Sequence, residues 1–364
     1  MFGFIFYLDV VRSLYFASDI FGEIPLYFAR HGKALRIATE IKQFCALGIN
    51  IKDVVPALPG VLYKYDIERD VLSFENYHNW NFLNNRIRFD TRKIVQLIKK
   101  SVFEKYSTID LQKSALLLSG GLDSAILAFE LAHLGLKTTF TVAADTEALD
   151  LKTAKAICDL LNLDFNPIIV NSLKPHCAIA VSETSNRSIV EEMTCHIVLG
   201  NVIRKNGIQV VFSGCGADEI FVGYQHLLRY RNKQTRKKLQ ADFVNSYYKM
   251  DLRAFNKIYM LNAIEVRNPF LSKNLLNYVS KLHVDELLIG RRREMKLALR
   301  QSYSKFLGEI VKIPKYIARE TMGAKDLLKN NYGDSPYVYR PLLRDIFCCP
   351  HRIIALMEEA KNTY

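Results

Sequence analysis

LLLSGGLDSAIL, residues 116–127, is the stretch that decides the fold. Three leucines lead directly into Ser119, Gly120 and Gly121, and a second apolar run begins behind Asp123. A short apolar run bounded by a turn is typical of a buried strand, and the longer run behind it suits a helix. Glycines allow a tight turn, and the amino terminus of a helix favours negative charge. The stretch therefore predicts a strand, a phosphate-binding corner and a helix.

The chain continues this alternation after the corner. Strands are expected at 115–118, 138–142, 167–170 and 208–213, and helices at 123–134, 150–161 and about 188–205. Strands separated by helices form βαβ units, which assemble into a parallel, doubly wound sheet. Another helix is expected behind Asp90, and the last 100 residues are expected to be helical. The predicted fold class is α/β.

The first 85 residues have a different pattern. FIFYL, SLYFA, IPLYFA and ALRIA are short segments rich in aromatic and branched residues, separated by turn signals. They predict a small β-rich unit in front of the α/β unit. We therefore expect two domains, residues 1–85 and residues 86–364.

Composition limits the class of protein. None of the 364 residues belongs to an apolar stretch of roughly 20 residues, so no membrane association is expected. The seven cysteines show no CxxC spacing, which favours a reducing cytoplasmic location over a disulfide framework or a zinc site. The net charge of +13 is concentrated in residues 229–238 and 290–296. Such runs bind nucleic acid, neutralise polyphosphate or form solvated helix faces.

A second corner has the same form as the first. VVFSGCGADEIFVGY, residues 210–224, again combines a strand, a glycine-rich turn, carboxylates and a helix. Asp218 opens its helix as Asp123 opens the other, and two aspartates at neighbouring strand ends can hold one Mg²⁺ with phosphate oxygens. Glu219 is either a second metal ligand or a helix-terminal acid favoured by the dipole. The two corners predict a site for pyrophosphate and metal.

These motifs resemble the synthetase domain of the asparagine synthetase family, a branch of the ATP pyrophosphatases. SGGLDS is followed by SGCGADEIFVGY, then by IEVRNPFLS (264–272), REMKLALRQ around Lys296, and IPKYIARETMGAK (313–325). Order and spacing agree over about residues 90–330. The resemblance implies a doubly wound sheet of the ATP pyrophosphatase type with a helical carboxyl-terminal part.

The resemblance also implies the site residues, with ATP and Mg²⁺ as cofactors. Lys296 and Lys315 occupy the family's two lysine positions and would face pyrophosphate, with Lys312 as a spare candidate. The nucleotide would contact Ser119, Gly120, Gly121, Asp123 and Ser124 at the first corner, and Leu118, Val142, Ser213 and Gly214 around adenine and ribose. Asp123 and Asp218 would hold the metal.

Three positions bear on the amine and carboxylate substrates. Cys215 stands where many asparagine synthetases have a glutamate, so it is either a weak base or an inert packing residue. Glu265 is expected to assist amine deprotonation, or alternatively to form a structural ion pair with Arg267. Ser272 replaces the family's usual aspartate, which weakens the expectation of an α-amino acid substrate.

The amino-terminal unit is similar to the last part of the family's glutaminase domain. Phe2 stands where that family has its catalytic cysteine, so the unit is interpreted as a truncated remnant without the nucleophile. We expect no glutaminase activity of its own, unless a separate glutaminase subunit supplies the missing half.

The default function is ATP-dependent amide synthesis, from aspartate and ammonia to asparagine, with release of AMP and pyrophosphate. The alternatives are a related ligase for another carboxylate or a peptide, an enzyme that modifies nucleic acid, and a non-catalytic binding protein. A small carboxylate and ammonia are the expected partners, and nucleic acid is disfavoured. A homodimer is left open.

Overall fold

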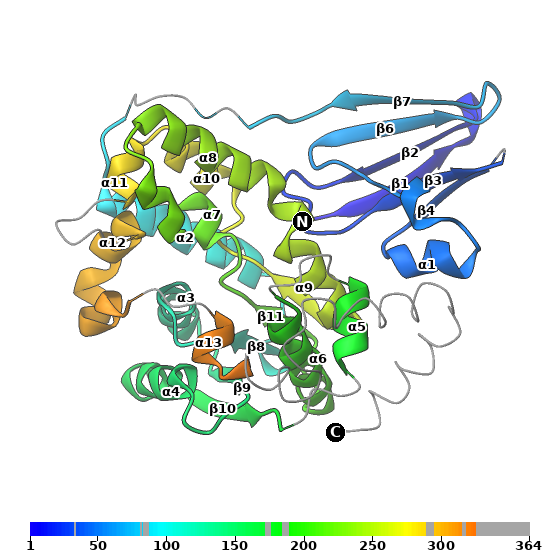
Figure 1. Ribbon diagram of the computed structural model, residues 1–364. Helices are drawn as coiled ribbons and strands as arrows, with labels where there is room; N and C mark the ends of the chain where they lie inside the picture. The colour runs from blue at the N-terminus through cyan, green and yellow to red at the C-terminus, as the bar shows by residue number, and fades with distance from the viewer. Residues whose placement is uncertain are drawn as a thin grey trace.

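The computed structural model describes residues 1–32, 34–80, 82, 87–171, 176–183, 189–288, 295–314 and 318–324. Figure 1 shows a β-rich unit at the amino terminus beside a larger unit that contains most of the helices. The larger unit contains both predicted corners.

A five-stranded parallel sheet forms the centre of the larger unit, in the order β10-β9-β8-β11-β12. Its strands are β8 (Ser114–Leu117), β9 (Thr138–Ala143), β10 (Asp164–Ile169), β11 (Val210–Phe212) and β12 (Glu265–Arg267). The first of these strands in the chain, β8, is central. The next two, β9 and β10, lie on one side of it, and the last two, β11 and β12, lie on the other side. Ligands bind at the switch point of such a sheet, and here β8 and β11 lie side by side at that point.

Helices cover both faces of this sheet because neighbouring side chains of a strand point to opposite faces. Leu116 packs in one buried cluster with α2 (Thr91–Tyr106) and α3 (Leu122–His133). Leu117 packs in a second cluster with α6 (Val190–Lys205). The predicted doubly wound α/β architecture is confirmed.

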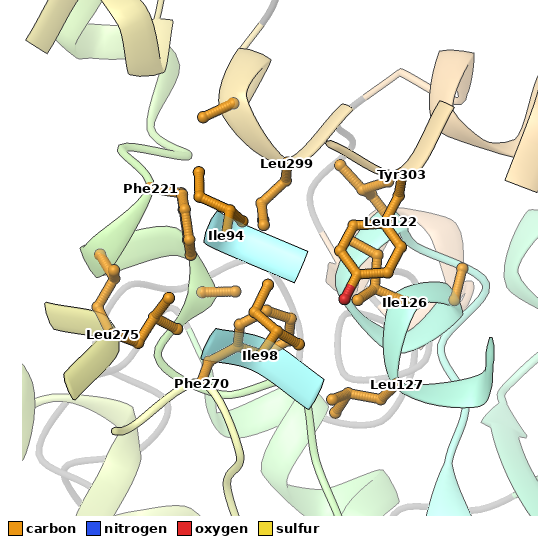
Figure 2. Close-up of a cluster of buried hydrophobic side chains, with 14 of the residues drawn as sticks. Ile94, Ile98, Leu122, Ile126, Leu127, Phe221, Phe270, Leu275, Leu299 and Tyr303 are labelled. Atoms are coloured by element: carbon orange, nitrogen blue, oxygen red, sulfur yellow. The ribbon is translucent and has the colours of Figure 1, made fainter. Parts of the chain in front are cut away.

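Further helices complete the larger unit. They are α4 (Leu149–Leu161), α5 (His176–Glu183), α7 (Ala217–Ile220), α8 (Lys233–Ser246), α9 (Asp251–Met260), α10 (Lys273–Val279), α11 (Val284–Leu288), α12 (Leu297–Leu307) and α13 (Ala318–Thr321). Figure 2 shows Ile94 and Ile98 of α2 in the first cluster, between Phe270 on one side and Leu122 and Ile126 of α3 on the other. Helix α2 thus supports the helix that carries Asp123.

The predicted elements that fall within the described residues match the structure within a few residues, with two differences. Residues 325–364 of the expected helical part lie outside the described residues. The strand expected at 167–170 is β10, which begins at Asp164 and includes Pro167. A proline is tolerated there because β10 lies at an edge of the sheet. Strand β12 lies in the part expected to be helical. Three residues are too few to show a period, so the sequence pattern could not predict it.

The amino-terminal unit contains two antiparallel sheets. The first has the order β1-β2-β6-β7, with β1 (Gly3–Leu8), β2 (Ser13–Ser18), β6 (Val61–Asp66) and β7 (Val71–Asn76). The second has the order β4-β3-β5, with β3 (Tyr27–His31), β4 (Ala34–Ala38) and β5 (Val55–Pro56), and α1 (Ile41–Ala46) lies between β4 and β5 in the chain. Phe16 stacks on Tyr63 at 4.8 Å and meets Phe28 at 5.4 Å between ring centroids, which gives this unit its own small core.

The two units are joined through buried polar contacts. Glu23 is almost fully buried and accepts hydrogen bonds from Asn268 Nδ2 at 3.0 Å and from Lys105 Nζ at 3.4 Å. Arg253 of α9 donates to the carbonyl oxygen of Ala57 at 2.5 Å. A buried carboxylate is costly unless it is paired, so these contacts fix the docking of the amino-terminal unit.

Asn268→Ala is expected to destabilise the protein, because it leaves Glu23 buried with one donor fewer. The free energy of unfolding in urea should fall by about 1–3 kcal/mol. Asn274→Ala, at an exposed position on α10, should change it by less than about 0.5 kcal/mol. Equal stability of the two variants would show that the contact does not hold the units together.

Part of the first basic run, residues 229–238, is buried inside the protein. Arg236 and Lys237 of α8 are both buried; Arg236 Nη1 lies 2.8 Å from Asp285 Oδ1, and Lys237 Nζ donates to the carbonyl of Leu282 at 3.1 Å. These two charges hold α8 against α11 and its preceding turn, so they are not available to nucleic acid. Among the described residues, no helix has the length and apolar character needed to cross a membrane.

Candidate active site at the carboxyl ends of the parallel strands

The two predicted corners are neighbours in the structure. Residues 118–121 connect β8 to α3, and residues 213–216 connect β11 to α7. Because β8 pairs with β11 in parallel, both corners lie side by side at the carboxyl ends of these two strands. A Cβ added to Gly214 would lie 3.1 Å from Cβ of Asp123, so the corners are in direct contact.

The first corner depends on glycine at position 120. Gly120 has a φ of +73°, and a Cβ there would lie 1.9 Å from Oγ1 of Thr153. Ser124 Oγ lies 3.1 Å from Ser119 Oγ and donates to the carbonyl of Gly121 at 3.0 Å, which fixes the loop on the first turn of α3. The corner is therefore a rigid turn at a helix amino terminus, as a phosphate site requires.

Asp123 and Asp218 converge on one cation, the ammonium group of Lys296. Lys296 Nζ lies 2.7 Å from Asp218 Oδ1 and donates a short hydrogen bond to Asp123 Oδ2. The Lys296 side chain is only 3% exposed, whereas the two aspartates are partly open. Two carboxylates from different corners and a lysine from a third segment thus form one charged centre.

Two neighbouring spaces surround this centre. A cavity of about 560 Å³ is lined by these predicted residues: Leu118, Ser119, Asp123, Ser124, Val142, Ser213, Gly214, Cys215 and Asp218. A smaller one of about 100 Å³ is lined by Ser119, Gly120, Gly121, Asp123 and Lys296. Both lie at the carboxyl ends of the strands. The larger volume suits a nucleoside, and the smaller is enclosed by the phosphate corner and the lysine.

The residues at the centre fit a divalent cation that arrives with phosphate. Asp123 and Asp218 already direct oxygens at one positive charge, and carboxylate oxygens are the ligands that Mg²⁺ prefers. Within the described ranges, no group of three or more metal-ligating side chains is found. Two carboxylates leave most of an octahedral shell to phosphate and water.

Some predicted residues do not reach this centre. Glu265 lines neither space; it opens β12 opposite Val210, and its Oε1 accepts from Arg267 Nε at 2.8 Å. This geometry disagrees with a role in amine deprotonation and fits the alternative, a structural ion pair. Lys312 is exposed and pairs with Glu309 at 2.5 Å. Lys315 lies outside the described residues.

Ser272 has a local structural role. It is the N-cap of α10, where its side chain accepts from the backbone N–H of Leu275 at 3.5 Å. Serine is a preferred N-cap residue, as aspartate is, so the replacement keeps the cap. In this structure, Ser272 therefore acts as a helix cap.

Cys215 lines the large cavity, but burial raises the pKa of its thiol to about 12. Its backbone N–H donates to Ser213 Oγ at 3.2 Å, which is a contact of the turn and not of the thiol. A thiol with such a pKa stays protonated near neutral pH. The structure favours inert packing over a basic role.

Alkylation of Cys215 by iodoacetamide at pH 8 is expected to be slow, since only about one thiol in 10⁴ would be ionised. Cys215→Ser should change the rate of amide formation less than about threefold. Peptide mapping by mass spectrometry and a steady-state assay test the two statements. Rapid alkylation at pH 8 would contradict the packing role.

The sequence pattern missed several groups that line the large cavity. Glu192 and His196 come from α6, Tyr247 precedes α9, and Asp251 opens α9. Burial lowers the pKa of His196 to about 4, so its imidazole is neutral, with Nδ1 2.7 Å from the hydroxyl of Tyr259. None of these residues belongs to a glycine-rich motif. Only the packing of α6 and α9 beside β8 and β11 brings them to the site.

Glu219 also lines the cavity and accepts a short hydrogen bond from Tyr224. Burial, and secondarily the charge of Asp218, raises the pKa of Glu219 to about 8. Among the described residues, the ion pairs of Lys296 are with Asp123 and Asp218. We therefore restrict the proposed metal site to these two carboxylates.

The sheet order and the two corners together define an α/β fold of the ATP pyrophosphatase type. The asparagine synthase family model matches residues 96–243 and 229–332. The chain belongs to the asparagine synthase family.

Individual relatives agree with this family. Asparagine synthetase B [glutamine-hydrolyzing] of Escherichia coli is 24% identical over 333 residues, which are 84% of this chain and 58% of the relative. Asparagine synthetase [glutamine-hydrolyzing] 2 of Lotus japonicus is 25% identical over 321 residues, 80% of this chain and 52% of the relative. The chain thus spans between half and three-fifths of the length of these relatives.

Among solved structures, the NH3-dependent NAD synthetase of Campylobacter jejuni is 16% identical, with a TM-score of 0.29. The match covers 63% of this chain and 100% of that one.

Proposed function

We propose that the protein is an ATP-dependent amide ligase that activates a carboxylate as an acyl-adenylate. The observation that carries the proposal is the convergence of Asp123, Asp218 and Lys296 beside a cavity large enough for a nucleoside. Family membership adds the reaction class, because the relatives are named as asparagine synthetases.

In the first step, a carboxylate oxygen of the substrate attacks the α-phosphorus of ATP. The bond from that phosphorus to the bridging oxygen breaks, and pyrophosphate leaves with the electron pair. Negative charge grows on the departing group, so a buried ammonium at this point lowers the barrier. Lys296 has this role in the proposal, with Lys315 as the second candidate.

In the second step, an amine nitrogen attacks the acyl carbon, the carbon–oxygen bond to AMP breaks, and the amine loses a proton. Leu118, Val142, Ser213 and Gly214 would contact adenine and ribose, since all four line the large cavity. Asp123 and Asp218 would hold Mg²⁺, which supplies positive charge to the phosphate oxygens. Glu265 has no part in the proposal.

The default substrates are aspartate and ammonia, as the names of the relatives suggest. The glutamine hydrolysis in the names of the relatives is not part of the proposed reaction. We propose that nitrogen enters as free ammonia or from a separate glutaminase subunit.

One observation favours a different carboxylate. Asp123 and Asp218 are assigned to the metal, and the pKa of Glu219 is raised to about 8. The rest of the described lining of the large cavity contains three acids, Asp150, Glu192 and Asp251, and no Lys or Arg. A second free carboxylate on the substrate would be repelled there, whereas an amino group would be attracted. A carboxylate that carries an amine is therefore the second candidate.

Product analysis tests the proposed function. The protein is incubated with MgATP, ammonium and either aspartate, β-alanine or succinate, and AMP, pyrophosphate and amide are measured. Asparagine with AMP supports the default, and an amide of β-alanine alone supports the second candidate. ADP as the nucleotide product would contradict adenylation.

A further inference from the structure

Lys296 is held in an unusual backbone conformation at the centre of the site. It is the residue before α12, and its φ is +56°, a left-handed value that residues other than glycine seldom adopt. The residue is 2% exposed. Strained backbone persists only where its surroundings fix it, and it gathers at functional positions.

The ammonium lies between the two proposed metal ligands. Lys296 Nζ contacts Asp218 Oδ1 at 2.7 Å and donates to Asp123 Oδ2. Gly223 closes the arrangement from another side, because a Cβ there would lie 1.8 Å from Asp218 Oδ1 and 2.5 Å from Cε of Lys296. The lysine therefore occupies the position at which both aspartates direct a carboxylate oxygen.

We propose that Lys296 is an internal occupant of the divalent-cation site, so that metal enters only after nucleotide phosphate has drawn the ammonium away. This inference rests on the proposed function, because it assumes that ATP binds at the first corner. It assigns Lys296 a second role besides charge stabilisation: it makes metal binding conditional on nucleotide.

The electrostatics of the three side chains supports this order. The ammonium neutralises one of the two carboxylate charges and fills the space between them. A metal ion would therefore be repelled by the ammonium and would find its position already occupied. Without the lysine, two partly buried carboxylates would face each other with no cation between them, which is costly unless a metal ion takes its place. A triphosphate offers the ammonium a new anionic partner and brings oxygen ligands for the metal.

Nucleotide and metal must then strengthen each other's binding by the same factor, since coupling between two sites is reciprocal. Couplings of this kind are roughly 5–150-fold. Phosphate oxygens alone give part of this coupling, so the contribution of Lys296 is the part that Lys296→Met loses.

Mn²⁺ titration followed by electron paramagnetic resonance tests the inference, with Mn²⁺ as the probe and a non-hydrolysable ATP analogue as the nucleotide. Wild-type protein should bind Mn²⁺ weakly alone and roughly 5–150-fold more tightly with the analogue. Lys296→Met should bind Mn²⁺ without nucleotide, tighter than wild type by a similar factor. Lys155→Met removes an exposed lysine of α4 that lines neither space at the site, and it should behave as wild type.

The outcomes separate this inference from the proposed function. The inference is overturned if wild-type protein binds Mn²⁺ with the same affinity with and without the analogue, and if Asp123→Asn abolishes this Mn²⁺ binding. The ligase proposal would still stand. If wild type does not bind the analogue in equilibrium dialysis, the proposed function fails first. If Lys296→Met is unfolded without metal, the inference predicts that Mn²⁺ alone restores its thermal transition. A variant that stays unfolded with Mn²⁺ would contradict it.

Discussion

Asp123→Asn is expected to lower the rate of adenylate formation by about 10²–10⁴-fold, because the amide removes one charge from the site that holds metal and lysine. The same change leaves the buried Lys296 with one carboxylate instead of two. Asp218→Asn should act in the same direction and by a similar factor. Release of pyrophosphate with a saturating carboxylate measures both effects.

Asp159→Asn is the matched control for this pair. Asp159 is an exposed acid of α4 that pairs with Lys155 at 2.7 Å, and it lines neither of the two spaces at the site. Its replacement should leave pyrophosphate release unchanged. Near-normal activity in both Asp123→Asn and Asp218→Asn would remove the metal role from this site.

Gly223→Ala should be almost as damaging, although it adds one methyl group. The added Cβ would overlap Asp218 Oδ1 at 1.8 Å and Cε of Lys296 at 2.5 Å, so one of these side chains has to move. A shift of about 1 Å in a positioned group can cost about 100-fold in rate. We therefore expect at least that loss in pyrophosphate release, with about 1–3 kcal/mol of destabilisation from overpacking.

Gly207→Ala separates the local clash from a general effect of alanine. Gly207 follows α6, and a Cβ there meets nothing within 4 Å, although its φ of +77° makes the substitution mildly strained. It should cost stability but not activity. Full activity in Gly223→Ala would mean that Asp218 and Lys296 are not held as closely as the geometry indicates.

The sequence predicted the two corners because their chemistry is local. SGGLDS and SGCGADE each combine turn residues, a helix start and a carboxylate within a few positions. Parallel strands have their carboxyl ends on the same side of a sheet, so the two motifs predict that Asp123 and Asp218 lie near each other if their strands are neighbours. The direct bridge through Lys296, from a segment more than 70 residues later, could not be predicted in this way.

Glu265 shows why a motif alone misplaces a residue. The position in EVRNPFLS suggested a role near the amine, but β12 runs parallel to β11 and Glu265 stands at its start. The site lies beyond the opposite end. Without the strand and its direction, no sequence pattern distinguishes the two ends.

Long-range packing explains what else was missed. Glu192 and Asp251 reach the cavity because α6 and α9 pack beside the sheet, and Glu23 meets Asn268 across 245 positions of the chain. Such contacts depend on how elements dock, which local periodicity does not specify. The β-rich pattern of the first 85 residues was visible in the sequence, but its joint with the larger unit was not.

Exchange of labelled pyrophosphate into ATP is the most direct test of acyl-adenylate formation, because the label returns only if the first step is reversible and precedes amide formation. We expect exchange that requires Mg²⁺ and a carboxylate, proceeds without any amine, and is lost in Asp123→Asn. Tight binding of ATP with no exchange for any carboxylate in a broad screen would contradict it.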